Sequence, residues 1–264
     1  MFGIGNTIGA GVFALTGLAA QYAGIESFLT NFKIGPSVIV SFFICGVISA
    51  MTALVYAEFS GRMPFSGSGY QYIYCSFGEL PAWIIGWNMN LRYGVTAGAL
   101  IRGWSQYVVG LFAKIGIALP VWLYSLNVFG YDTSIITVLY VILCTYIVTL
   151  GSKESNVFNY VFTVAKLGTL LLISVMALTY MNVDNYTPFV LEEKGGWSGT
   201  IQGASVIYFA FLGFDFITCL AEETRNPIKD LPRSIMMTIN SCTLLYCLIS
   251  GSMSGMAKLA NFNP

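Results

Sequence analysis

Four glycines fall within nine residues near the start of the chain, in the run Gly3-Ile4-Gly5-Asn6-Thr7-Ile8-Gly9-Ala10-Gly11. A glycine in a helix interior costs about 1 kcal/mol relative to alanine, so the run needs a reason. One interpretation is close helix packing, in which Gly5 and Gly9 form a small-xxx-small pair. The other is a broken helix, whose free amide N–H groups and positive half-helix end bind a carboxylate. The run by itself supports both interpretations equally.

A second run, Tyr208-Phe209-Ala210-Phe211-Leu212-Gly213-Phe214-Asp215-Phe216, places an aspartate two residues after a glycine within an apolar stretch. An acidic side chain in such a stretch needs a partner or water. The run is either a glycine kink with Asp215 bonded to a neighbouring helix, or a second broken helix whose free carbonyls accept an ammonium group. Two breaks, in spans five apart, are what an inverted five-plus-five transporter repeat predicts.

The composition indicates which elements hold these runs. Of the 264 residues, 56% are hydrophobic and 9% are charged, with a mean hydropathy of +0.73. A soluble domain is about one quarter charged, which argues against a water-soluble or disordered chain. Lys plus Arg equals Asp plus Glu, 12 each, so no net charge attracts nucleic acid. The chain has no histidine, which argues against histidine catalysis and most metal sites. We predict no metal, no cofactor and no enzymatic activity.

Apolar segments of about 20 residues cross the hydrocarbon core of a membrane. The sequence therefore predicts an all-α integral membrane protein, with residues 1–264 forming one transmembrane domain. It contains seven candidate spans, at about 4–24, 37–57, 83–111, 134–150, 157–181, 200–221 and 234–257.

Basic residues in the loops predict a cytoplasmic N-terminus, because five lie in inner loops and four in outer loops. The chain has one Asn-x-Ser/Thr site, which begins at Asn185 and lies in a loop predicted to be external. Asn185 is therefore a glycosylation candidate. We expect the plasma membrane, with the vacuolar or lysosomal membrane as alternatives.

The chain carries motifs at positions that are similar to those of a known superfamily. They are Gly5 to Phe13, Tyr56-Ala57-Glu58-Phe59, Arg62-Met63-Pro64, Gly67-Ser68-Gly69-Tyr70-Gln71-Tyr72, Gly78-Glu79-Leu80, Gly86-Trp87-Asn88, Arg102-Gly103-Trp104-Ser105, Gly213-Phe214-Asp215, Glu222-Glu223, Asn226-Pro227 and Pro232. In this order and spacing they resemble the amino acid–polyamine–organocation superfamily, and most closely its cationic amino acid transporters.

The resemblance implies the LeuT-like five-plus-five fold with broken first and sixth helices, and alternating-access transport of L-amino acids. Cationic substrates such as arginine, lysine and ornithine are expected; a neutral amino acid or polyamine permease is the alternative, and a seven-helix receptor is the alternative from another class. The substrate carboxylate would bind at Thr7, Ile8, Gly9, Ala10 and Gly11, and the ammonium at carbonyls of Phe209, Ala210 and Leu212. Phe211 and Phe214 are candidates for an aromatic gate, with core packing as the other interpretation.

Several charged residues in or beside the spans need partners or roles. Lys166 lies near the middle of its span, so it either couples transport to protons or tethers carbonyls of the first span. Glu79 opens the third span, where it is either a helix-start anion or a residue needed for transport. Arg92 would repel a cationic substrate, pair with an acid such as Asp215, or stabilise an anionic substrate. In the loop after the sixth span, we expect Glu222 and Glu223 to pair with Arg225 or Arg233.

The resemblance also implies ten core helices, of which this sequence supplies the first repeat and two helices of the second. We therefore expect the chain to be the N-terminal part of a longer transporter.

Overall fold

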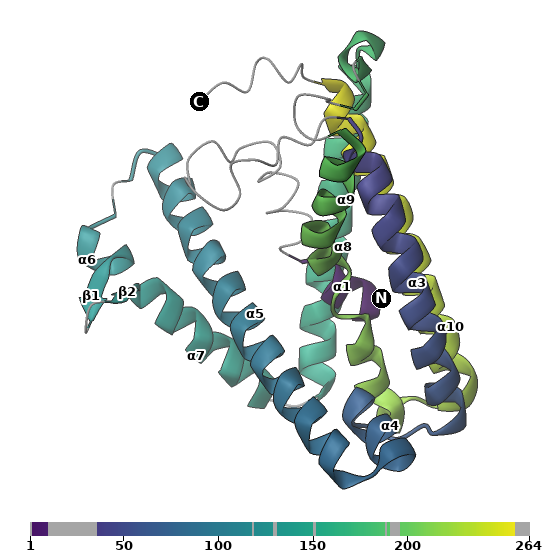
Figure 1. The fold of residues 1–264 in the computed structure, drawn as a ribbon. Helices are drawn as coiled ribbons and strands as arrows, with labels where there is room; N and C mark the ends of the chain where they lie inside the picture. Colours follow the sequence, from purple (N-terminus) through teal and green to yellow (C-terminus); the bar gives the residue numbers. More distant parts are fainter. Residues whose placement is uncertain are drawn as a thin grey trace. The chain divides into compact units, whose positions relative to one another are not determined.

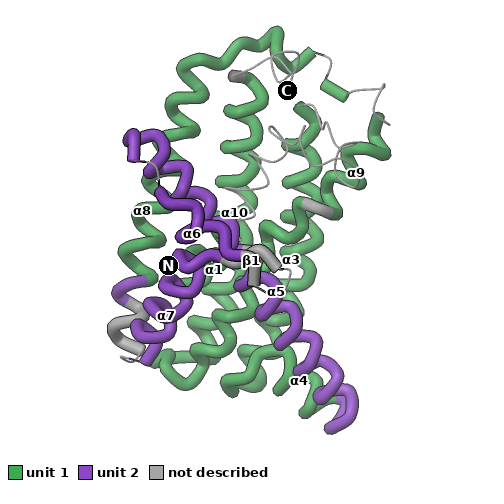
Figure 2. Tube along the Cα trace, turned by 90° about the vertical axis from the view of Figure 1, so that its left-hand side faces the viewer, with its two compact units in different colours: residues 1–76, 159–264 green, residues 77–158 purple. Residues whose placement is uncertain are grey.

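The computed structural model describes residues 2–9, 36–117, 119–128, 131–149, 152–187, 189–190 and 196–256. By its internal contacts the chain divides into two compact units, shown in separate colours in Figure 2. Unit 1 consists of residues 1–76 and 159–264, and unit 2 of residues 77–158. The prediction of a single transmembrane domain stays a prediction.

The core of unit 1 is built on two long helices, α3 (Val38–Arg62) and α10 (Pro227–Met256), which lie side by side in Figure 1. Gly46 permits this close approach, because a Cβ atom added to it would collide with the side chain of Thr243. Phe42 of α3 and Tyr246 of α10 are about 1% exposed, and their ring centroids lie 5.6 Å apart. The shared face of these helices is therefore closely packed.

The predicted sixth span is interrupted. Helix α9 (Gly196–Ile207) continues as a 3₁₀ segment, η3 (Tyr208–Phe211), and a second 3₁₀ segment, η4 (Phe214–Glu223), follows after Gly213. Both α9 and η3 pack against α3, and η4 packs against α10. The interruption thus lies inside the core of unit 1.

Three further elements complete unit 1. The short helix α1 (Phe2–Thr7) packs against α10 and η4, and α8 (Ser152–Thr179) enters the unit at Asn159. Helix α4 (Ser68–Phe77) follows the turn after α3. A 3₁₀ turn, η1 (Val183–Tyr186), is bound to the end of α10.

Unit 2 contains α5 (Glu79–Lys114), α6 (Val121–Tyr124) and α7 (Ile135–Thr149). A small antiparallel hairpin of β1 (Leu126–Val128) and β2 (Tyr131–Thr133) connects α6 to α7. Trp104 of α5 stacks on Tyr140 of α7, with ring centroids 4.2 Å apart. The hairpin was not predicted, but the all-α class is confirmed.

Helices form at six of the predicted spans, and of the first span only residues 4–9 are described. Within the described residues, four segments are long and apolar enough to cross a membrane: Val38–Arg62, Val157–Thr179, Gly196–Glu223 and Pro227–Gly255. Helix α7 is shorter, at 15 residues, and the 36-residue α5 is not among the four. Helix α3 continues past the predicted span end at residue 57, through Glu58 to Arg62, and these two residues form an ion pair of 2.7 Å.

Candidate functional site

The first helix ends inside the glycine-rich run. The Thr7 hydroxyl donates to the Gly3 carbonyl at 2.9 Å, and the Ile8 amide donates to the Ile4 carbonyl at 2.8 Å. The next amide, that of Gly9, makes no hydrogen bond to another described residue. A Cβ atom added to Gly9 would meet no atom of the described chain within 4 Å. Within the described residues, Ile8 is thus the last residue of the run whose amide bonds back into the helix.

The other glycines of the run serve close packing. A Cβ atom on Gly3 would collide with Ile217 of η4, and one on Gly5 would collide with Thr163 of α8. The predicted packing role therefore holds for Gly5. For Gly9 both interpretations stay predictions, because the residues that follow it lie outside those described. Ala10 and Gly11, predicted to bind the same carboxylate, lie outside the described residues.

The break in the sixth span packs directly against the end of α1. Gly213 has a φ of +115°, a backbone conformation that L side chains rarely adopt. A Cβ atom added to it would lie 2.8 Å from the Asn6 carbonyl oxygen and 3.4 Å from the Thr7 nitrogen. The two glycine-containing runs, some 200 residues apart in the sequence, thus meet backbone to backbone.

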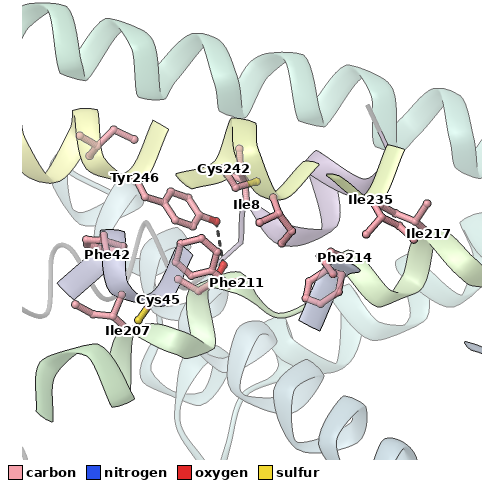
Figure 3. Packing of buried hydrophobic residues seen from close by; sticks show 14 of the residues in the cluster. Ile8, Phe42, Cys45, Ile207, Phe211, Phe214, Ile217, Ile235, Cys242 and Tyr246 are labelled. Carbon is pink, nitrogen blue, oxygen red and sulfur yellow. Dashed lines mark hydrogen bonds between the residues drawn. The ribbon is translucent and has the colours of Figure 1, made fainter. Parts of the chain in front are cut away.

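Tyr246 of α10 links the two runs. Its hydroxyl lies 3.1 Å from the Thr7 carbonyl oxygen and 2.9 Å from the Ala210 carbonyl oxygen, to which it donates. Figure 3 shows this hydroxyl pointing toward η3, with the Phe211 ring beside it. Sequence reasoning missed Tyr246. The available signal was a tyrosine inside an apolar span, because a buried tyrosine hydroxyl needs a partner.

Lys166 of α8 reaches the same helix end from another side. Its ammonium group donates to the Gly5 carbonyl at 3.1 Å and to the Ile8 carbonyl at 3.3 Å. A cation at the C-terminal end of a helix is favoured by the helix dipole. The contacts fit the tether that was one of the two predicted roles, and they do not test proton coupling.

The two gate candidates lie in the hydrophobic core. Phe211 is fully buried against Tyr246, with ring centroids 5.0 Å apart, and Phe214 is 4% exposed against Tyr56 at 5.8 Å. Figure 3 shows both side chains among other apolar residues of the cluster. The described arrangement is the core packing that was the alternative interpretation.

Asp215 is 3% exposed, and its backbone carbonyl anchors a neighbouring turn. That carbonyl accepts hydrogen bonds from the hydroxyl of Thr218 at 2.6 Å and from that of Ser68 at 3.3 Å. Ser68 is the one described residue other than glycine with a positive φ, of 52°. The hydrogen bond from Ser68 to Asp215 thus holds the turn before α4 against η4.

A family model described as amino acid permease matches residues 2–262. The chain belongs to the amino acid permease family. It is 36% identical to the methylthioribose transporter of Bacillus subtilis, over 100% of this chain and 55% of that protein. It is 37% identical to the branched-chain amino acid permease BcaP of the same organism, over 99% and 54%. It is 33% identical to the vacuolar cationic amino acid transporter 4 of Arabidopsis thaliana, over 99% and 43%.

These comparisons confirm the predicted membership of the amino acid–polyamine–organocation superfamily, and cationic amino acid transporters are among the relatives. Together with the long apolar helices, they make the permease chain a multi-pass membrane protein. The chain spans about half the length of the curated relatives it matches, between 43% and 55% of the three named here.

Two predicted charges of the permease lie in unit 2. Glu79 is exposed and is the first residue of α5, in the position of a helix-start anion. Arg92 donates to the Tyr93 hydroxyl at 2.7 Å, and its guanidinium carbon lies 4.6 Å from the centre of that ring. Its predicted alternatives, among them pairing with Asp215 of unit 1, stay predictions.

The loop after the sixth span differs from expectation. Within the described part of the permease, the ion pair is Glu58 with Arg62, so the expected pairing of Glu222 and Glu223 with Arg225 or Arg233 is not observed. Instead the Glu222 carboxylate accepts a hydrogen bond of 2.5 Å from the hydroxyl of Ser66, in the turn before α4.

Near that turn, Tyr72 of α4 is buried against Phe59, with ring centroids 5.3 Å apart. Burial raises the pKa of the Tyr72 phenol to about 12, so it is neutral at physiological pH.

The glycosylation candidate Asn185 makes a structural contact. Its side-chain amide donates to the Gly255 carbonyl at 2.7 Å, at the end of α10. The adjacent Tyr186 hydroxyl donates to the Gly251 carbonyl at 2.7 Å. These bonds hold η1 against α10, and glycosylation of Asn185 stays a prediction.

Proposed function

We propose that this chain forms the substrate-holding part of a permease that carries L-amino acids across a membrane by alternating access. The observation that carries the proposal is the meeting of the end of α1 with the interrupted sixth span, where Gly213 packs against Asn6 and Tyr246 reaches carbonyls of both. Family membership supports the same function. Irregular backbone at membrane depth is tolerated where it is buried in protein or lines a cavity, and substrate sites of this fold class are built from it.

The chemistry of the two ends suits a zwitterion. The amide of Gly9 would donate to the α-carboxylate, with Thr7, Ile8, Ala10 and Gly11 completing the same turn. The carbonyls of Phe209, Ala210 and Leu212 would accept from the α-ammonium. A carbonyl oxygen has two lone pairs, so Ala210 can hold the Tyr246 hydroxyl and a substrate proton together. No side-chain charge is needed for either end, which leaves recognition of the substrate side chain to other residues.

Binding of radiolabelled arginine, lysine and leucine to the purified chain in nanodiscs tests the proposal. A Gly9→Leu variant places a bulky side chain at the end of α1, and a Gly98→Leu variant of α5 is the matched control, since neither glycine has a described neighbour within 4 Å. We expect saturable binding by wild type and by Gly98→Leu, and at least a tenfold loss in Gly9→Leu. Equal binding by both variants would contradict the site. Absence of binding by wild type would contradict the proposal that this chain holds substrate, while its family membership would stand.

The finer proposal is a preference for cationic substrates, carried over from the sequence motifs. The named relatives are a methylthioribose transporter, a branched-chain amino acid permease and a cationic amino acid transporter, so their names do not favour one side-chain class. Competition of bound arginine by lysine, by leucine and by methylthioribose decides. We expect lysine to displace arginine at the lowest concentration, and displacement by leucine at a lower concentration than lysine would identify a neutral amino acid permease.

Two properties of the whole protein belong to the same proposal. We place it in the plasma membrane with its N-terminus in the cytoplasm, and we keep proton coupling through Lys166 as a testable alternative to the tether. Labelling of Cys75, an exposed cysteine of the turn helix α4, by an impermeant maleimide tests the orientation. Labelling from the outside of intact cells would contradict it.

A further inference from the structure

Helix α3 holds α9 through a ladder of small polar side chains spaced four residues apart. The Thr200 hydroxyl donates to the Ser37 hydroxyl at 3.1 Å. The Ser41 hydroxyl donates to the Thr200 carbonyl at 2.8 Å, and the Cys45 thiol donates to the Ala204 carbonyl at 2.9 Å. Residues four apart lie on one face of a helix, so the ladder runs along α3 and α9 together. Figure 3 shows Cys45 beside Ile207, where α9 ends.

The next residue on this face of α3 is Ser49. It is fully buried, and its hydroxyl has no hydrogen-bond partner within the described part of the chain. Buried polar groups are nearly always satisfied, so such an exception needs an explanation. Ser49 is the fourth member of the ladder, after three whose bonds are made.

The backbone of the sixth span changes helix type at the level where the bond at Ser49 is missing. The carbonyls that accept from α3 belong to Thr200 and Ala204, and the same spacing leads to Tyr208. Tyr208 is the first residue of η3, where the backbone changes from α to 3₁₀ geometry. A 3₁₀ helix has 3.0 residues per turn rather than 3.6, so its carbonyls rotate away from the line set by α9.

We propose that Ser49 is a positioning residue for the substrate's ammonium group, acting through the carbonyl of Tyr208. With an amino acid bound, residues Tyr208–Phe211 take α-helical geometry, and the Tyr208 carbonyl accepts the hydroxyl of Ser49 as the fourth bond of the ladder. This inference rests on the proposed function and adds a specific conformational step to it.

The conversion moves the groups that matter for binding. An α-helix rises 1.5 Å per residue and a 3₁₀ helix about 2.0 Å, so four residues shorten by about 2 Å and rotate. Phe209 and Ala210, whose carbonyls are the predicted ammonium acceptors, lie within those four residues. A ligand shifts an equilibrium between two states only if it binds one of them more tightly than the other. In this proposal the amino acid binds the α-helical state more tightly, because its carbonyls are reoriented toward the ammonium group.

A Ser49→Cys variant makes the new bond visible. Cys45 already shows that a thiol functions as a donor in this ladder. The S–H stretching band of a thiol moves to lower wavenumber when the thiol donates a hydrogen bond, and the wild-type spectrum subtracts the six native cysteines. Without ligand, we expect the S–H band of the added thiol at the wavenumber of a free thiol. With a saturating concentration of the amino acid that wild type binds best, we expect this band to shift to lower wavenumber.

Alanine variants separate positioning from structure. Ser41→Ala removes a bond that is already made, so we expect a lower melting temperature with little change in affinity for the amino acid. Ser49→Ala removes a hydroxyl without a partner, so we expect an unchanged or higher melting temperature and about a tenfold weaker affinity. Ser49→Thr and Ser49→Cys retain a donor and should restore the affinity.

The outcomes distinguish this inference from the proposed function. If wild type binds an amino acid but the Ser49→Cys band does not shift, or Ser49→Ala binds as tightly as wild type, the inference is wrong and the proposed function stands. If wild type binds none of arginine, lysine and leucine while its melting curve shows a folded chain, both are overturned.

Discussion

Two long segments of unit 1 each contain a residue that interrupts helices, yet only one of them is interrupted. Helix α10 continues from Pro227 to Met256 although Pro232 lies within it. The segment Gly196–Glu223 breaks at Gly213 into α9, η3 and η4. In a helix interior proline costs about 3 kcal/mol and glycine about 1 kcal/mol, so the stronger breaker is tolerated and the weaker one is not. Intrinsic preference therefore does not decide where these segments break.

The surroundings of the two residues account for the difference. Pro232 lies close to the start of α10, and its missing N–H deprives only the Ile228 carbonyl of a partner. Gly61 of α3 lies against that position, since a Cβ atom added to it would be 3.6 Å from the Ile228 oxygen. Gly213 instead packs against the Asn6 backbone at a positive φ. The contact with the end of α1, rather than the glycine alone, specifies the break.

The largest expected effect comes from Gly213→Ala. The Cβ atom would meet the Asn6 oxygen at 2.8 Å, and the φ of +115° is strained for alanine. We expect a loss of about 3 kcal/mol of stability, seen as a lower melting temperature, together with loss of amino acid binding. Gly94→Ala in α5, where no described atom lies within 4 Å, is the control and should be neutral or stabilising. A Gly213→Ala protein as stable as wild type would show that the contact does not specify the break.

Lys166→Met tests the end of the first segment. Two hydrogen bonds from an ammonium group to the Gly5 and Ile8 carbonyls are lost, for which we expect about 2 kcal/mol. Hydrogen exchange of the Ile8 amide should accelerate, and Lys114→Met, at the exposed end of α5, should leave it unchanged.

The same variant separates the two predicted roles of Lys166. A tether alone weakens uptake by a similar factor at every pH, whereas a proton-coupling lysine leaves uptake insensitive to pH once it is replaced. Exchange at Ile8 that matches wild type would contradict the tether.

Tyr246→Phe has a smaller expected effect because the ring still packs against Phe42 and Phe211. Loss of the hydroxyl bonds to Thr7 and Ala210 should cost about 1 kcal/mol in melting experiments. Tyr160→Phe, on an exposed face of α8, should cost nothing measurable.

A double variant that combines Tyr246→Phe with Gly213→Ala shows whether Tyr246 and the break at Gly213 act together. Residues that share one network give non-additive losses, so we expect the combined loss to be smaller than the sum of the two. Strict additivity would mean that the tyrosine does not link the interrupted segments.

The sequence predicted the interruption at Gly213, because a glycine followed by an aspartate in an apolar stretch is a local signal. The predicted break in the first span stays a prediction, since the residues after Gly9 lie outside those described. It also included the tether of Lys166 among its alternatives, since a lysine at mid-span needs oxygen partners. It could not rank that tether above proton coupling, because the partners are backbone carbonyls about 160 residues away, with no signature of their own.

The same limit explains what was missed. Tyr246 acts on carbonyls 239 and 36 residues away, and any residue type supplies a carbonyl. Ser49 is one more small residue in an apolar helix, and its meaning depends on the helix type of η3 opposite. The charged loop was misjudged because Glu222 found the hydroxyl of Ser66 rather than a nearby arginine. Local sequence patterns indicated where the backbone is irregular. Tertiary contacts determine which side chains form hydrogen bonds with the backbone groups that this irregularity leaves unpaired.

The smallest expected effect is that of Pro232→Ala, and it addresses the other half of the comparison. Alanine supplies the N–H that the Ile228 carbonyl lacks and removes the helix cost of proline, while the unfolded chain gains freedom that opposes folding. We expect a net gain of less than about 1 kcal/mol, measured as a small rise in melting temperature, with slower hydrogen exchange around Leu231. A fall in stability would show that α3 packs on the proline ring itself, which lies against Gly61. Pro232 would then be a packing residue of α10. Its contact with Gly61 would be the reason that helix α10 continues through a proline.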